Sequence, residues 1–132
     1  MLQDVVKIMR DCGAFYLATC DGDQARVRPF GSVMAYEDKI WFCTGNNKPV
    51  YDQLVAYPKV EICALQENGD WLRLCGKAVF SDDMDAKKAM FEADESLPEI
   101  YGSPEGKEFV VFYLDGLTAK LYHEEDAPKD ML

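Results

Sequence analysis

The sequence has a single histidine, His123, among its 132 residues, and none of its cysteines stands in a C-x-x-C pair. Zinc sites need several such ligands at short spacing, and a Cys–His nucleophile needs a histidine beside a reactive thiol. Both kinds of site are therefore disfavoured. An odd number of cysteines without close spacing also argues against a disulfide framework: Cys12, Cys20, Cys43, Cys63 and Cys75. Because reduced thiols are typical of the cytoplasm, we expect a cytoplasmic protein.

Basic residues are also scarce. Lys and Arg number 14 against 24 Asp and Glu, which gives a formal net charge of −10. That balance disfavours a nucleic-acid-binding surface, which must neutralise phosphates. No apolar run approaches the roughly 20 residues that span a bilayer, and charged residues interrupt the first ten positions, so we expect no membrane segment and no secretory signal. G-x-G-x-x-G and Walker A patterns are absent, so dinucleotide-binding and P-loop folds lack their motif.

Short apolar runs separated by turn signals are the main pattern that is present. They predict strands over residues 14–20, 25–36 (interrupted by Pro29 and Gly31), 40–44, 60–65 and 71–80, and a last hairpin, 109–114 and 117–122, around Asp115-Gly116. Helices are predicted over about 2–12, from Asn47 to before Pro58, and over 82–93, with a loop at 97–106. The strands do not alternate regularly with helices, which favours a mainly β antiparallel barrel over a doubly wound sheet. We expect one domain, residues 1–132, with residues 124–132 frayed.

Residues 41–54 form the most informative segment, because an apolar strand ends there and feeds directly into a helix. Asn47 is expected to cap that helix, and Pro49 suits its first turn. The junction gathers backbone N–H groups, the Thr44 hydroxyl, amides and the Lys48 ammonium around the positive end of a helix. That combination is typical of a phosphate site.

Three segments in this order resemble those of the pyridoxamine 5′-phosphate oxidase-like proteins, which are FMN-binding split β-barrels. They are Arg26-Val-Arg-Pro-Phe30, Thr44-Gly-Asn-Asn-Lys-Pro-Val-Tyr51 and Trp71-Leu-Arg-Leu-Cys-Gly-Lys77, and the resemblance covers residues 1–123. It implies a six- to seven-stranded antiparallel split β-barrel of Greek-key type with peripheral helices. It also implies a homodimer with FMN at the subunit interface.

The same resemblance implies a set of cofactor-binding residues. The segment 26–30 would lie along the isoalloxazine ring, the segment 44–48 would hold the phosphate, and Trp71 and Arg73 would approach the flavin, with either subunit as their source. The expected residues are Arg26, Arg28, Pro29, Phe30, Thr44, Gly45, Asn46, Asn47, Lys48, Trp71 and Arg73. The C-terminal substrate-binding region of the vitamin B6 oxidases has no evident counterpart here, which leaves the substrate open.

Plainer explanations exist for several of these residues. Lys48 and Arg26 fit solvated surface positions, Trp71 fits packing at a dimer seam, and Arg73 fits an ion pair with one of many carboxylates. No side chain stands out as an acid or base, which suits flavin chemistry. The expected function is an FMN-dependent oxidoreductase acting on a small substrate. The alternatives are a non-catalytic flavin carrier or sensor, and a split barrel that binds another ligand such as haem. His123 is the one histidine that could ligate haem iron.

Overall fold

One antiparallel sheet contains every strand of the protein. The computed structural model describes residues 1–132, and the hydrogen-bonded strand order is β2-β1-β5-β6-β7-β4-β3, with β8 pairing to β7. The elements in chain order are α1 (Leu2–Cys12), β1 (Phe15–Asp21), β2 (Gln24–Phe30), β3 (Met34–Tyr36), β4 (Lys39–Gly45), α2 (Pro49–Ala56), β5 (Lys59–Leu65), β6 (Trp71–Ser81), α3 (Met84–Ala93), α4 (Leu97–Tyr101), β7 (Phe109–Tyr122) and β8 (Lys129–Asp130).

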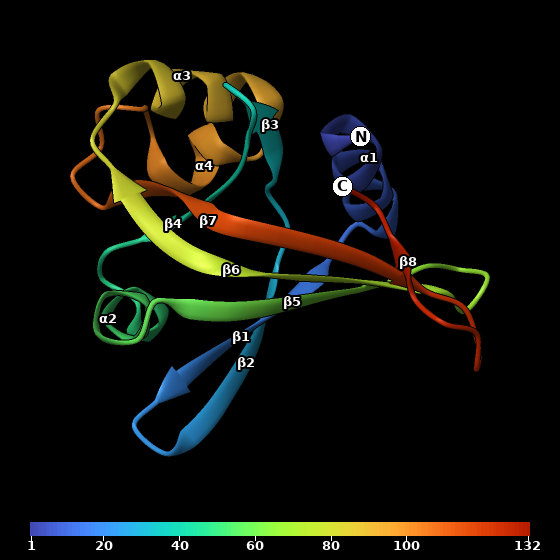
Figure 1. The fold of residues 1–132 in the computed structure, drawn as a ribbon. Helices are drawn as coiled ribbons and strands as arrows, with labels where there is room; N and C mark the ends of the chain where they lie inside the picture. The colour runs from blue at the N-terminus through green and yellow to red at the C-terminus, as the bar shows by residue number, and fades with distance from the viewer.

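The two edge strands of this sheet are neighbours in sequence. β2 ends at Phe30 and β3 begins at Met34, yet they lie at opposite ends of the strand order, so residues 31–33 cross the open seam of the sheet. The predicted single strand over 25–36 is therefore two strands on opposite edges. The chain leaves the β1 ladder after Phe30, next to Pro29, which has no N–H to donate to a ladder. The curled but unclosed sheet with peripheral helices confirms the predicted split barrel (Figure 1).

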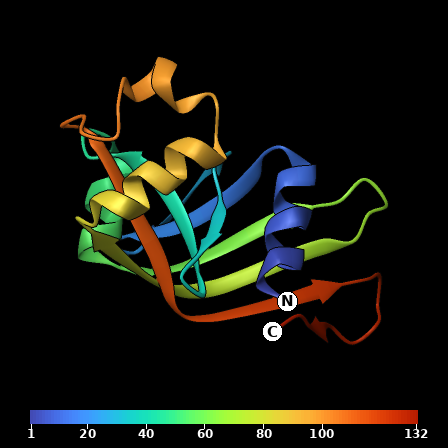
Figure 2. The ribbon, with the colours of Figure 1, turned by 90° about the horizontal axis from the view of Figure 1, so that it is seen from above.

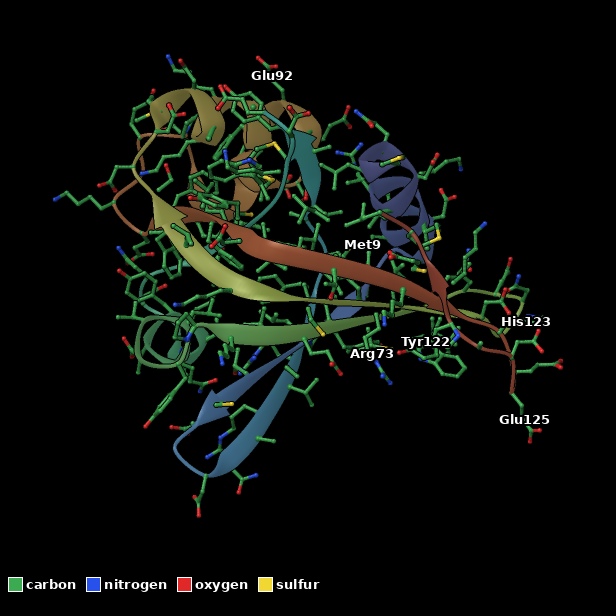
Figure 3. The ribbon with its side chains drawn as sticks, viewed as in Figure 1. Met9, Arg73, Glu92, Tyr122, His123 and Glu125 are labelled. Atoms are coloured by element: carbon green, nitrogen blue, oxygen red, sulfur yellow. The ribbon has the colours of Figure 1, made fainter.

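The core lies inside the curled sheet and under the helices. β5 alternates strictly, with Val60, Ile62 and Ala64 buried, because successive strand residues face opposite sides. Helix α1 buries Val5, Val6 and Met9 against this core, and Met9 is labelled in Figure 3. A second, smaller apolar cluster under α3 and α4 holds these helices beside β4 and β7: Met34, Trp41, Cys43, Ala86, Met90, Leu97, Phe109 and Val111. Figure 2 shows α3 and α4 on one side of the sheet, separate from α1.

The predicted hairpin around Asp115-Gly116 is wrong. β7 is one strand of 14 residues, and both of its halves pair with β6. Cys75 pairs with Thr118 and Lys77 pairs with Asp115. An advance of two residues along β6 therefore matches an advance of three residues along β7. Gly116 has φ 65°, a left-handed conformation that glycine adopts without strain. The Asp-Gly pair therefore marks a β-bulge, which uses the same residue types as a tight turn.

Two further segments differ from the sequence prediction or add to it. Residues 97–101, expected within a loop, form the short helix α4, in which Pro98 occupies the first turn. Residues 129–130, in the tail that was expected to fray, pair with β7 as β8, and the Met131 N–H donates to the Ala119 carbonyl at 2.9 Å. No helix of the chain is both long and apolar enough to cross a membrane.

Replacement of Gly76 should destabilise the fold at the bulge. A β-carbon at this position would lie 2.9 Å from Leu114 Cβ and 3.2 Å from the Asp115 carbonyl oxygen. We expect Gly76→Ala to lower the free energy of unfolding by about 1–3 kcal/mol, measured by urea denaturation, because overpacking strains the surrounding backbone. Gly31→Ala is the matched control, since a β-carbon at Gly31 meets nothing within 4 Å. Equal stability of the two variants would contradict the bulge geometry.

Candidate functional site

A cleft of about 210 Å³ lies where the β2–β3 crossing, the end of β4, the start of α2 and helix α4 meet. It gathers five of the residues expected to bind the cofactor: Arg28, Pro29, Phe30, Thr44 and Lys48. The remaining lining residues are Gly31, Ser32, Cys43, Val50, Leu97, Ile100 and Tyr101. The resemblance grouped the segments 26–30 and 44–48, and their proximity in one cleft agrees with that grouping.

A larger hollow of about 750 Å³ lies beside the end of α1 and the β5–β6 turn. Its lining residues include two carboxylates and no cation: Asp11, Cys12, Leu65, Gln66, Glu67 and Asn68. None of the expected site residues lies there. The smaller cleft is therefore the better candidate for an anionic cofactor, on chemistry rather than on size.

Thr44 and the start of α2 supply the hydrogen-bond donors of the cleft. Thr44 lines the cleft and is only 3% exposed, and its hydroxyl makes no hydrogen bond with another residue. The backbone N–H group of Val50, which also lines the cleft, has no backbone acceptor, as is usual where a helix begins. Together with the positive end of the helix, these donors favour an anion.

The predicted N-cap is wrong by one residue. Lys48 is the N-cap residue of α2, and no side chain caps the helix. Asn47 instead folds back over Gly45, where a β-carbon would lie only 2.6 Å from Asn47 Oδ1. Asn46 faces away from the cleft, since its side chain donates to the Lys107 carbonyl at 3.0 Å. Gly45, Asn46 and Asn47 therefore shape the junction, and their side chains are not among the cleft lining.

Lys48 has no carboxylate partner despite the acidity of the chain. Its Nζ atom lies 3.5 Å from the Tyr101 hydroxyl and 5.8 Å from the centre of the Tyr101 ring, and it forms no ion pair. Because Lys48 and Thr44 line the same cleft, an anionic ligand there would give the ammonium the partner that it lacks.

Arg28 is held rigidly at the opposite wall of the cleft. Its guanidinium donates to the Leu17 carbonyl at 3.0 Å and to Gln53 Oε1 at 2.6 Å, and Thr19 donates to the same Gln53 oxygen at 2.5 Å. Burial, with a contribution from Arg26, lowers the pKa of Arg28, which nevertheless stays a cation at neutral pH. Arg26 lies outside the cleft on the β1–β2 hairpin, where it pairs with Asp21 at 3.1 Å.

A hydrogen-bond network ties the β2–β3 crossing to α4. Ser32 donates to Asp94, which follows α3, and the Ser96 N–H and hydroxyl donate to the other Asp94 oxygen at 2.9 and 2.7 Å. Burial pushes the pKa of Asp94 up, but the hydrogen bonds from Ser32 and Ser96 outweigh it, and the pKa lies below its ordinary 3.8. The same crossing is also held to α1, since the Arg10 guanidinium donates to the Val33 carbonyl at 2.9 and 3.2 Å.

Trp71 and Arg73 lie far from the cleft of their own chain. The cleft lies near Thr44, which pairs with β7 beside the residue that pairs with Ser81, the last residue of β6. Trp71 is the first residue of β6, so about 33 Å of extended strand separates it from the cleft. Trp71 stacks on Tyr122 with ring centres 5.1 Å apart and planes 5° apart, and Arg73 lies 4.6 Å above the same ring. Figure 3 shows Arg73, Tyr122 and His123 at this end of the sheet.

The lone histidine belongs to this distant end as well. His123 Nδ1 lies 2.5 Å from Asp70 Oδ1, and the hydrogen bond and charge of Asp70 raise the pKa of His123. The contact is exposed, and it gives the histidine a structural partner.

Helix α4 was missed as part of the site. Leu97, Ile100 and Tyr101 all face the cleft, but they lie in a segment rich in proline and glycine that carried no recognisable pattern. Cys43, Ser32 and Val50 lie within two residues of the expected segments, so their position in the cleft follows from their neighbours. Burial raises the pKa of Cys43 to about 12, so this thiol stays protonated rather than acting as a nucleophile.

Comparison with known proteins identifies the family. A family model described as pyridoxamine 5′-phosphate oxidase matches residues 1–121. The chain belongs to the pyridoxamine 5′-phosphate oxidase family. A NimC/NimA family protein from Clostridium acetobutylicum is 34% identical over 97% of this chain and 89% of its own, with a TM-score of 0.91. No curated protein sequence matches the chain.

More distant members of this structural class share the fold alone. A pyridoxamine 5′-phosphate oxidase-related, FMN-binding protein from Nostoc punctiforme is 20% identical, with a TM-score of 0.71 and coverage of 98% of this chain and 95% of its own. The haem storage protein HutZ from Vibrio cholerae is 14% identical, with a TM-score of 0.68 and coverage of 87% and 91%. One fold thus carries two differently described proteins, so the ligand must be argued from the cleft.

The Asp94 network predicts an acid-dependent stability. A carboxyl whose folded pKa is depressed contributes stability that is present above its unfolded pKa and lost as the pH falls through the folded value. We expect Asp94→Asn to lower the free energy of unfolding by about 1–2 kcal/mol at pH 7, with a difference that shrinks as the pH falls below 3.8. Thermal unfolding across a pH series measures it. Asp82→Asn, at an exposed position, is the control, and parallel curves for Asp94→Asn and wild type would refute the role of the network.

Proposed function

We propose that this member of the family binds FMN in the cleft, with the phosphate at the β4–α2 junction, and works as a flavin-dependent oxidoreductase on a small substrate. The proposal rests chiefly on two residues that line this cleft: Thr44, which is 3% exposed and whose hydroxyl has no hydrogen-bond partner in the chain, and Lys48, whose ammonium has no ion-pair partner. The FMN-binding description of the Nostoc punctiforme protein supports the same choice of cofactor.

The donor set fits the phosphate end of FMN. A phosphate monoester carries nearly two negative charges and has only acceptor oxygens, and charge-assisted hydrogen bonds to such oxygens are the strong ones. The Thr44 hydroxyl, the Lys48 ammonium and the Val50 N–H are donors on residues that line the cleft, and none of them is engaged with a carboxylate. A carboxylate-bearing junction would repel the same group.

The rest of the cleft suits a flat aromatic ring. Arg28, Pro29 and Phe30 form one wall, and Val50, Leu97 and Ile100 supply apolar surface. Bound FMN supplies the hydride acceptor of the reaction. The chain's own contribution is to hold the phosphate, to cover part of the ring and to exclude water. The thiol of Cys43 and the phenol of Tyr101, which also line the cleft, both keep their protons at neutral pH, since burial raises the pKa of each to about 12.

We place the cofactor at the interface of a homodimer. A cleft of about 210 Å³ is smaller than the roughly 300–1,000 Å³ of most ligand pockets, so one chain encloses only part of the ligand. Trp71 and Arg73 cannot reach the cleft of their own chain. In a symmetric dimer, the Trp71–Tyr122 stack of one subunit would complete the cleft of the other. Five free cysteines support the expected cytoplasmic location.

A non-catalytic flavin carrier would have the same cleft, and reduction of the bound flavin by an electron donor distinguishes an enzyme from such a carrier. Anaerobic mixing with NADH or NADPH bleaches the flavin of an oxidoreductase that uses these donors and leaves a carrier yellow. Haem binding has weaker support, since the lone histidine, His123, is engaged with Asp70.

Reversal of the charge at Lys48 should abolish FMN retention. Lys48→Glu places a carboxylate beside the phosphate, and we expect at least a hundredfold weaker FMN binding, measured by flavin fluorescence titration. Lys88→Glu makes the same change of charge on α3, outside the cleft, and should bind FMN as the wild type does. Equal affinity of the two variants would rule out the phosphate assignment.

A composite site predicts complementation between two defective subunits. We expect Lys48→Glu and Trp71→Ala each to lose FMN binding as homodimers. Unfolding and refolding them together forms mixed dimers, in which one of the two sites is intact. Random pairing should then restore about one quarter of the wild-type FMN sites. No recovery, with mixed dimers verified by mass spectrometry, would show that Trp71 serves the cleft of its own chain or none.

A further inference from the structure

Tyr101 is the one hydroxyl-bearing aromatic residue in the cleft, and no motif predicted it. It ends α4, is half-buried, and packs against Phe109 with ring centres 5.1 Å apart. Its backbone is tightly held, because the Ser103 N–H donates to the Tyr101 carbonyl at 3.1 Å, and a β-carbon at Gly106 would lie 2.8 Å from that carbonyl oxygen. The side chain therefore has a defined position at the edge of the cleft.

The direction of its contact with Lys48 leaves the phenolic proton free. An ammonium has only donors, so the Tyr101 oxygen accepts in the 3.5 Å contact with Lys48 Nζ. No other residue accepts from the Tyr101 hydroxyl. Burial raises the pKa of Tyr101 to about 12, so the proton is retained at neutral pH. Tyr101 thus has a donor to offer, and it lies beside a cation that also lacks an anionic partner.

We propose that Tyr101 and Lys48 form a two-donor clamp on the anionic group of the ligand, with the Tyr101 hydroxyl donating to a phosphate oxygen and the Lys48 ammonium to another. The inference rests on the proposed function for the identity of that ligand, FMN. It assigns helix α4 a share in cofactor recognition that the β4–α2 junction alone does not provide.

The clamp also accounts for the anchoring of α4. The helix has only five residues, too few to be stable alone, and its position depends on the Asp94 contacts with Ser32 and Ser96. Those contacts tie α4 to the β2–β3 crossing, which forms the opposite wall of the cleft. A residue that donates to a ligand needs such support, because a displaced donor loses its hydrogen bond.

Comparison of FMN with riboflavin isolates the contact, because the two differ only by the phosphate. We expect Tyr101→Phe to weaken FMN binding about tenfold and to leave riboflavin binding unchanged, both measured by fluorescence titration. Phenylalanine preserves the packing on Phe109, and an unchanged melting temperature verifies it. Tyr57→Phe, at an exposed position outside the cleft, should change neither affinity.

The outcomes separate the clamp from the proposed function. If wild type binds FMN and Tyr101→Phe binds it equally well, or loses FMN and riboflavin to the same extent, the clamp is overturned while FMN binding stands. If wild type binds neither flavin, the proposed function fails, and inorganic phosphate observed by phosphorus NMR becomes the probe. Phosphate binding by wild type that is lost in both Tyr101→Phe and Lys48→Gln would sustain the clamp, and no phosphate binding would overturn it.

Discussion

The crossing of residues 31–33 from one edge of the sheet to the other is the constraint on which the rest of the structure depends. It joins β2 to β3 across the open seam, so the sheet curls without a closed hydrogen-bond ladder. Arg10 holds this crossing through the Val33 carbonyl, and Asp94 holds it through Ser32. Because Arg28, Pro29 and Phe30 lead into the crossing while Asp94 leads into α4, the same contacts set both walls of the cleft.

The cleft concentrates positive charge in a strongly acidic protein. The chain carries a formal net charge of −10, yet Lys48 has no carboxylate partner and Arg28 is paired only with a carbonyl and an amide oxygen. An anion bound in the cleft would meet both of these cations with no carboxylate paired to either of them. The acidity of the remaining surface would at the same time discourage binding of polyanions.

The sequence predicts the local part of this architecture well. The β1–β2 hairpin, the strand-to-helix junction and the acidic start of α3, where Asp83 accepts from the Asp85 N–H, each follow from a few neighbouring residues. The errors arise where distant contacts decide between local options. Asp115-Gly116 reads as a turn, but both flanking runs find the same partner strand, so it becomes a bulge. Asn47 reads as a helix cap, but its side chain fits over Gly45 instead.

Residues that join the site from far along the chain could not be predicted at all. Tyr101 meets Lys48 only because α4 is folded onto the cleft through Asp94, a contact that no spacing in the sequence announces. If the β4–α2 junction holds the phosphate of FMN, the unaltered protein must distinguish FMN from riboflavin. We expect FMN to bind about a hundredfold more tightly in a fluorescence titration of both flavins. Equal affinities would show that the junction does not bind the phosphate.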